Sequence, residues 1–83
     1  MQKSARQRQE ESEYRALLRE IREQSQLRQG DLAQRLGRPQ SYVSKFETGE
    51  RRLDIFELRA ICTACGVGLL DFFRQLEERI NRL

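Results

Sequence analysis

Two groups of residues in this 83-residue chain have types and spacings that could support chemistry. The first is a pair of cysteines, Cys62 and Cys65, which have the CxxC spacing of zinc and redox sites. The chain contains no histidine and no further cysteine, so a tetrahedral zinc site would lack its usual remaining ligands. Two buried, unreactive thiols are therefore the favoured interpretation, and a redox-sensing pair is the alternative. We expect neither a metal nor a cofactor.

The residues of this chain do not form a recognisable catalytic constellation. Without histidine, a serine or cysteine nucleophile would need a lysine or a carboxylate as its base. The two lysines, Lys3 and Lys45, lie in a polar N-terminal segment and in a polar central run. The carboxylate pairs Glu10–Glu11 and Glu77–Glu78 are adjacent in sequence, so their members point in different directions on a helix. We therefore expect a protein that is not an enzyme.

The second group is the polar run itself, which lies between Pro39 and Gly49. Residues 40–47 read QSYVSKFE, and only Val43 and Phe46 look buried. The other side chains are groups that can hydrogen-bond to base edges. A helix about 10–12 Å in diameter fits the major groove of B-DNA, which is about 12 Å wide. The run therefore suits a helix that contacts DNA, and a helix with a solvated polar face is the alternative.

The distribution of charge supports the same interpretation. The net charge is +3, and residues 28–52 alone contain six basic and three acidic side chains. Fourteen of the sixteen basic residues are arginine, whose planar guanidinium suits phosphates and guanine edges. The arginine content also fits the codon bias of a GC-rich genome. The position of the charge, in the stretch that contains the polar run, favours a nucleic-acid partner.

Five helices are needed to place these residues. A polar arm, residues 1–11, is expected to be flexible, and Ser12 is a candidate N-cap for a first helix that ends near residue 25. Gly37 and Gly49 are candidate terminators of the second and third helices. Asp54 is a candidate N-cap of the fourth helix, with Glu57 completing a capping box. The expected helices after the first are residues 30–36, 39–47, 54–65 and 69–83.

The stretch from Leu17 to Val67 resembles the Cro/cI-like, XRE-type helix-turn-helix domain of bacterial and phage regulators. The matching pieces, in order, are Leu-Arg before the first turn, Gln29, Asp31-Leu32-Ala33, Leu36-Gly37, Gln40-Ser41-x-Val43-Ser44-x-x-Glu47-x-Gly49, Arg51, Leu58-x-x-Ile61 and Gly66-Val67. The resemblance implies an all-α, five-helix, lambda-repressor-like fold whose DNA-binding domain spans residues 12–67. The third helix would be the recognition helix.

The resemblance implies roles for the side chains of the polar run. Gln40 matches a position that commonly reads a base edge, and adenine is the geometrically suited partner of a glutamine. Ser41 and Ser44 match further groove contacts. Tyr42 is grouped with them, with packing inside the domain as an equal alternative, and Lys45 suits a phosphate better than a base. Without the resemblance, Gln40 and Ser41 would be interpreted as solvated residues of a first helical turn.

The same resemblance implies phosphate contacts and an ion pair. Gln29 matches a glutamine that clamps a DNA phosphate while bracing the recognition helix. Arg51 matches a basic position that contacts the backbone after the recognition helix. Arg22 and Glu47 match a partly buried ion pair that joins the first helix to the third.

Two positions depart from the family pattern. Gly30 stands where a helix-favouring polar residue is usual, which costs about 1 kcal/mol of helix propensity and allows a close approach of the backbone to a phosphate. Arg38 and Pro39 replace an apolar residue and a hydroxyl cap, so the geometry of proline would set the start of the third helix. Arg38 is expected either to contact a phosphate or to lie in solvent.

The last predicted helix is richer in large apolar residues than one face of a small domain requires. We expect a symmetric homodimer built on this helix, residues 68–83, because such a surplus often marks an interface. A helix that closes the core of a monomer is the alternative. Two-fold pairing would also place two recognition helices about 34 Å apart on DNA. The predicted interface residues are Phe73, Leu76, Ile80 and Leu83.

Taken together, the residues and the resemblance predict a sequence-specific DNA-binding transcriptional regulator, a repressor or autoregulator that binds a pseudo-palindromic operator. The alternative is an antitoxin-type module that binds a partner protein and uses DNA only for autoregulation.

We expect no membrane partner and a cytoplasmic location, because the chain has neither a long apolar run nor a secretory signal. We also expect no separate ligand-sensing domain in so short a chain.

Overall fold

The computed structural model describes residues 2–83, and these residues form five helices and no strand. The predicted all-α fold is confirmed. The helices are α1 (Ala5–Gln24), α2 (Gln29–Leu36), α3 (Gln40–Thr48), α4 (Ile55–Ala64) and α5 (Leu69–Asn81).

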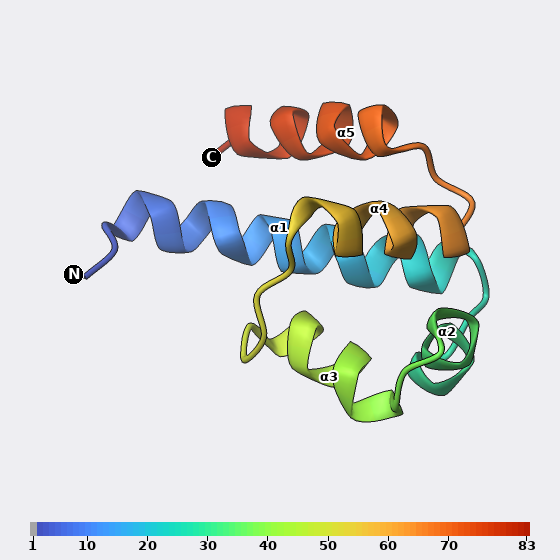
Figure 1. Ribbon diagram of the computed structural model, residues 1–83. Helices are drawn as coiled ribbons and strands as arrows, with labels where there is room; N and C mark the ends of the chain where they lie inside the picture. The colour runs from blue at the N-terminus through green and yellow to red at the C-terminus, as the bar shows by residue number, and fades with distance from the viewer. Residues whose placement is uncertain (1) are drawn as a thin grey trace.

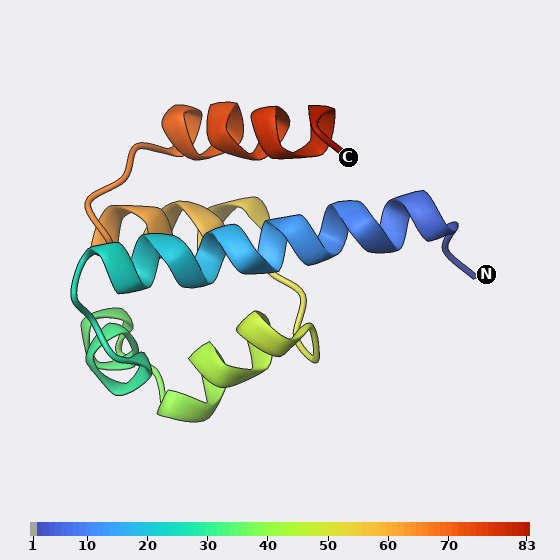
Figure 2. The same ribbon diagram turned by 180° about the vertical axis from the view of Figure 1, so that it is seen from behind.

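The longest helix, α1, has 20 residues and is therefore about 30 Å long. It packs against α3 and α5, while α2 packs against α3 and α4, and α4 packs against α5. Figure 1 shows α5 on one side of α1 and α4, and α2 and α3 on the other. The view from behind in Figure 2 shows the same order, and the start of α1 and the end of α5 lie at the same end of the molecule. No helix within residues 2–83 is long and apolar enough to cross a membrane.

All five helices contribute apolar side chains to one core. Aromatic and branched residues fill its centre, and full burial of such a side chain stabilises the fold by about 1.5–3 kcal/mol. This core holds α2 and α3 firmly against the rest of the molecule. The largest fully buried side chains are Phe46, Phe72, Leu17, Leu18, Ile21, Leu32, Ile61 and Val43.

The ends of the two central helices are set by glycine and by a capping box. Gly37 ends α2 with a φ of +66°, and Gly49 ends α3 with a φ of +90°, in the left-handed region that glycine adopts without strain. Asp54 caps α4, because Glu57 N donates to Asp54 Oδ1 (2.8 Å) and Asp54 N donates to Glu57 Oε1 (3.0 Å). These sequence predictions are confirmed. Pro39 is the N-cap of α3 instead of its first helical residue.

The start of α1 was predicted wrongly. The helix begins at Ala5 and not near Ser12, so the expected flexible arm is helical over residues 5–11, while Met1 lies outside the described residues. The cap is Ser4, whose Oγ accepts a hydrogen bond from Gln7 N (3.1 Å). Gln7 Oε1 in turn accepts from Ser4 N (3.0 Å), which completes a capping box in the most polar part of the chain.

Contacts with other elements stabilise this polar first half of α1. Arg6 Nε lies 3.2 Å from Glu10 Oε2, one helical turn along, and Arg6 Nη2 donates to the carbonyl oxygen of Ile80 in α5 (3.0 Å). Glu13 forms an ion pair with Arg79 of α5 (3.4 Å). The first turns of α1 thus pack on the end of α5 through charged groups, and an apolar stripe is not required there.

Candidate nucleic-acid interface

The two short helices α2 and α3 pack against each other and are joined by a three-residue turn, residues 37–39. This is a helix-turn-helix, in which the second helix enters the major groove of DNA. In the first turn of α3, Gln40 and Ser41 are exposed, and further along the helix Ser44 is half-buried and Lys45, in the last turn, is exposed. Of the side chains predicted to meet DNA, Gln40 and Ser41 therefore lie at the N-terminal end of α3, and Ser44 and Lys45 lie about one turn further on.

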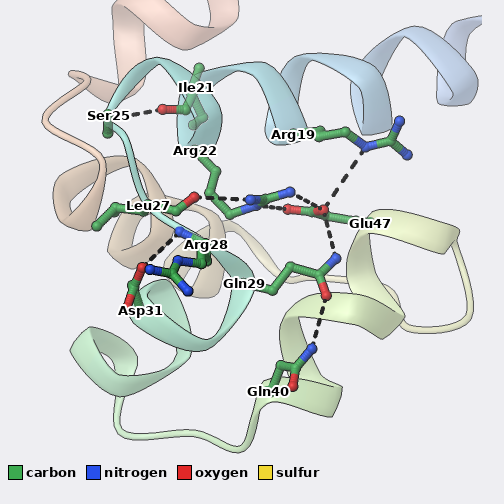
Figure 3. Close-up of polar contacts among 10 residues, drawn as sticks. All are labelled: Arg19, Ile21, Arg22, Ser25, Leu27, Arg28, Gln29, Asp31, Gln40 and Glu47. Carbon is green, nitrogen blue, oxygen red and sulfur yellow. Dashed lines mark hydrogen bonds and ion pairs between the residues drawn. The ribbon is translucent and has the colours of Figure 1, made fainter.

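A buried ion pair joins α1 to α3 (Figure 3). Arg22 Nε donates to Glu47 Oε2 (2.7 Å), and Arg22 Nη2 donates to Glu47 Oε1 (3.0 Å). Arg22 Nη1 also donates to the carbonyl oxygen of Leu27 (2.9 Å), which fixes the turn between α1 and α2. Both residues are buried, at 8% and 2% exposure, and the hydrogen bond to Glu47 raises the pKa of Arg22 still further. Two hydrogen bonds in a fork geometry make this a rigid attachment point.

Two glutamines extend this ion pair toward the surface (Figure 3). Gln29, the first residue of α2, donates from Nε2 to Glu47 Oε1 (3.1 Å). Gln40, the first residue of α3, donates from Nε2 to Gln29 Oε1 (3.3 Å). An amide has two N–H donors, so Gln40 retains one donor and its oxygen for another partner. The exposed Gln40 amide is therefore oriented from the core, through Glu47 and Gln29.

Tyr42 does not belong to this exposed surface. Its side chain is buried, with 8% exposure, and its ring lies edge-on to Phe46 with the ring centroids 5.5 Å apart. The hydroxyl donates to Glu57 Oε2 in α4 (3.3 Å). Burial, followed by the nearby Glu57 carboxylate, raises the pKa of Tyr42. Of the two alternatives for Tyr42, burial favours packing inside the domain over base readout. The prediction that only Val43 and Phe46 of this segment are buried is wrong, because Tyr42 and Glu47 are buried as well.

Two arginines flank α3 and meet at the tyrosine ring. The Cζ atoms of Arg38 and Arg51 lie 4.6 and 4.9 Å from the centroid of the Tyr42 ring. Arg51 Nη2 is also 2.6 Å from Glu57 Oε2, and Arg38 Nη2 is 3.9 Å from the same oxygen. Hydrogen bonding from the Asp54 backbone, and then from Arg51, lowers the pKa of Glu57. We call Arg38, Tyr42, Arg51 and Glu57 the tyrosine cluster.

Only the capping role of Glu57 in α4 could be predicted from the sequence. Its second role arises because the Tyr42 and Arg51 side chains, on either side of the turn that follows Gly49, both reach the Glu57 carboxylate. The chain carries no local signal for this proximity. The capping box was the only available indication that the Glu57 side chain would be held in one place.

The two cysteines lie in the core. Cys62 has 0% exposure and Cys65 has 6% exposure. Burial raises the pKa of Cys62 to about 11 and also raises the pKa of Cys65. Because the thiolate is the reactive form, both groups are poor nucleophiles and poor metal ligands. Within residues 2–83, the acidic and cysteine side chains do not gather into a group that could hold a metal ion.

The apolar residues of α5 are divided between the core and the surface. Leu76 packs partly against the core and Ile80 is half-buried, whereas Phe73 and Leu83 are 38% and 45% exposed. Leu70, at the start of α5, is 84% exposed, which the sequence reasoning did not anticipate. Two further exposed apolar residues lie at the start of α4. They are Ile55 and Phe56.

Comparison with known proteins agrees with this geometry. A family model described as a helix-turn-helix domain matches residues 13–72, which include all of α2, α3 and α4. A solved structure described as an XRE-family like protein from Pseudomonas syringae pv. tomato str. DC3000 is 43% identical to this chain. The match covers 81% of this chain and 85% of that chain, with a TM-score of 0.71. No curated protein matches the chain.

The fold, the paired helices and these matches define a helix-turn-helix DNA-binding protein. The family model covers well over half of the chain, and the solved relative is similar over most of its length. The chain belongs to the XRE-type family of helix-turn-helix transcription regulators.

Proposed function

We propose that this chain is a sequence-specific transcriptional repressor or autoregulator that binds a pseudo-palindromic operator as a homodimer. The observation that carries the proposal is the hydrogen bond from Gln40 to Gln29, which is anchored on the buried Glu47. A base-reading side chain needs a fixed orientation, because hydrogen bonds to base edges weaken steeply when they are misaligned. A solvated glutamine in a surface helix does not need such a support.

Base recognition is assigned to the exposed end of α3. The remaining N–H and the oxygen of the Gln40 amide match N7 and N6 of an adenine in the major groove. Ser41 is exposed beside it, and Ser44 follows one turn along the same helix. Lys45 is exposed and suits a phosphate or a guanine edge.

Phosphate contacts are assigned to groups on both sides of α3. Gln29 lies at the N-terminus of α2, where backbone N–H groups and the helix dipole favour an anion. Arg38 and Arg51 are 49% and 40% exposed in their side chains, so both are accessible to a DNA backbone. These contacts would set the register of α3 on the duplex without reading sequence.

Dimerisation is assigned to the exposed apolar surface of α5. Phe73 of α5 and Leu83, two residues after the end of α5, remain substantially exposed, and Leu76 and Ile80 lie between them in the sequence. A single recognition helix contacts only about four base pairs, which gives limited specificity. A two-fold dimer doubles the contacted sequence and explains why apolar side chains would be kept at the surface.

A selection of bound sequences from random double-stranded DNA tests the proposal. We expect an inverted repeat whose half-sites are separated by about one helical turn, about 34 Å. Sedimentation of the free protein should give a dimer at micromolar concentration. Recovery of a single unrepeated half-site would overturn the dimer assignment, and recovery of no preferred sequence would overturn sequence-specific binding.

The role of Gln40 can then be measured on the selected operator. The Gln40→Ala variant should lose discrimination at one base pair of each half-site, by about 1–3 kcal/mol, while its binding to unrelated DNA changes little. Gln24→Ala, which changes an exposed glutamine at the end of α1, is the matched control and should leave the operator preference intact. Unchanged discrimination in Gln40→Ala would show that α3 is docked differently.

A further inference from the structure

One aromatic ring in this structure lies against two arginines that come from opposite ends of the recognition helix. Arg38 precedes α3 and Arg51 follows it, and neither lies within a helix. Both guanidinium groups nevertheless lie over the Tyr42 ring, at 4.6 and 4.9 Å from its centroid. Cations are attracted to the face of an aromatic ring at such distances. Tyr42 therefore brings together two charges that the backbone alone would leave separate.

Glu57 attaches this group to the scaffold. Its Oε2 atom is 2.6 Å from Arg51 Nη2 and accepts a hydrogen bond from the Tyr42 hydroxyl (3.3 Å). Its Oε1 atom accepts a hydrogen bond from Asp54 N (3.0 Å) in the capping box of α4. The carboxylate is therefore held from both oxygens, and its charge reduces the repulsion between the two arginines. One negative and two positive groups leave the tyrosine cluster with one net positive charge.

The arginines are held but remain accessible. Their side chains are 49% and 40% exposed, for Arg38 and Arg51 respectively, so the ring and the carboxylate cover only part of each group. A guanidinium has five N–H donors, and Arg51 uses few of them within the tyrosine cluster. Each arginine can thus keep its contact with Tyr42 while it donates to a phosphate.

An arginine that is already ordered binds its target at lower cost. A free arginine side chain carries about 2 kcal/mol of rotamer entropy, part of which is lost when it is immobilised on a ligand. Ordering it beforehand removes part of that cost from the binding step. The benefit applies to every DNA sequence, because a phosphate contact is independent of the base.

We propose that Tyr42 is a positioning residue of the DNA interface, which with Glu57 holds Arg38 and Arg51 in place for backbone phosphates. The proposal rests on the proposed function, because it assumes that α3 docks on DNA. It gives Tyr42 a role in DNA affinity without any contact between its ring and a base.

The test compares Tyr42→Leu with Tyr14→Leu. Tyr14 is the other tyrosine of the chain and packs edge-on to Phe72 of α5, so its replacement also removes an aromatic contact but leaves both cation–π contacts of Tyr42 in place. Tyr42→Leu should weaken binding to the operator and to unrelated DNA alike, by about 5- to 30-fold, because part of the rotamer entropy of two arginines is then lost on binding. Tyr14→Leu should leave binding of the folded protein unchanged. Tyr42→Phe, which keeps the ring, should bind within a few-fold of the wild type.

A double-mutant cycle separates positioning from a purely structural role. In a chain that carries Arg38→Gln and Arg51→Gln, adding Tyr42→Leu should cause no further loss of DNA affinity. A further loss as large as that in the wild-type background would overturn the proposal. So would a change in operator preference caused by Tyr42→Leu, because it would mean that the ring acts on base readout.

Nuclear magnetic resonance of the free protein tests the positioning without DNA. Relaxation of the arginine Nε–H groups should find Arg38 and Arg51 ordered in the wild type and in Tyr42→Phe, and mobile in Tyr42→Leu. Mobile arginines in a wild-type protein that binds its operator would overturn the positioning role alone. A wild-type protein with ordered arginines that binds no DNA would instead overturn the proposed function, and the phosphate role with it.

Discussion

Arg22–Glu47 and Arg51–Glu57 are both arginine–glutamate pairs that support the surface around α3, but their surroundings differ. The side chains of the first pair are 10% and 2% exposed, and those of the second are 40% and 20% exposed. The buried pair supports Gln40 through Gln29, whereas the exposed pair belongs to the tyrosine cluster and supports Arg51. The two pairs thus hold the side chains that we propose for base readout and for phosphate contact.

This difference follows from what each contact must achieve. A base contact needs two aligned hydrogen bonds, so the Gln40 amide benefits from an attachment that does not move. A phosphate has several acceptor oxygens and tolerates a range of approach angles, so a surface cluster is sufficient for the arginines. Breaking the buried pair should therefore destabilise the fold strongly, whereas breaking the exposed one should change the stability little and mainly weaken DNA binding.

The largest expected effect is the loss of the buried pair in Glu47→Gln. This variant leaves the Arg22 guanidinium buried without its countercharge, which typically costs 3–5 kcal/mol of unfolding free energy. Urea denaturation measures the loss. Glu57→Gln makes the same chemical change at the surface and keeps a side chain able to complete the capping box, so its cost should stay at or below about 1 kcal/mol.

If Glu47→Gln and Glu57→Gln lost equal amounts of unfolding free energy, the buried pair would not stabilise the fold more than the exposed pair does. A small loss of unfolding free energy in Glu47→Gln would mean that the Arg22 guanidinium becomes hydrated or moves away from its buried position. In that case the Gln29 and Gln40 amides would not have a rigid support, and operator discrimination should fall together with the orientation of Gln40.

Much of the fold could be predicted because its signals are local. Gly37, Gly49 and the Asp54–Glu57 box mark helix ends within a few residues, and the apolar spacing between them identifies the buried faces. The exposed positions of Gln40 and Ser41 also follow from local sequence, together with the resemblance to a known family. Features that depend on one short stretch of chain were predicted well.

The features that were missed depend on contacts between distant segments. The first turns of α1 have no apolar stripe, and their helix is supported by Ser4, by Gln7 and by the contact of Arg6 with Ile80, 74 residues away. The orientation of Tyr42 was similarly ambiguous, because a tyrosine suits both a core and a groove. The hydrogen bond from the Tyr42 hydroxyl to Glu57, a residue of another helix, favours the core position over the groove position.

The same contrast between buried and exposed groups predicts how pH affects stability. Burial raises the pKa of Cys62 to about 11 in the folded protein, while an unfolded cysteine titrates near about 8.5. The folded state therefore keeps its full stability below about pH 8.5 and loses part of it as the pH rises toward 11, by an amount on the order of 3 kcal/mol. Urea denaturation at several pH values measures this dependence.

Cys62→Ala is the control for this titration. It should be less stable at neutral pH, because it removes a buried sulfur, but its stability should fall less steeply above pH 8.5. Thiol labelling of the native wild type should be slow for both cysteines. Rapid labelling under native conditions, or an identical pH dependence in the variant, would contradict a buried thiol with a raised pKa.

The smallest expected effect concerns Gly30, the residue after Gln29 in α2. A Cβ at this position would meet no atom within 4 Å, and the residue has no positive φ, so Gly30→Ala should stabilise the fold by about 0.4–1 kcal/mol. We expect the same variant to bind all DNA sequences several-fold more weakly, because the added methyl group lies where the backbone of α2 would approach a phosphate. Thermal unfolding and binding to operator and unrelated DNA measure the two effects. Unchanged affinity together with higher stability would mean that this helix end does not need glycine for DNA, and that Gln29 alone makes the contact.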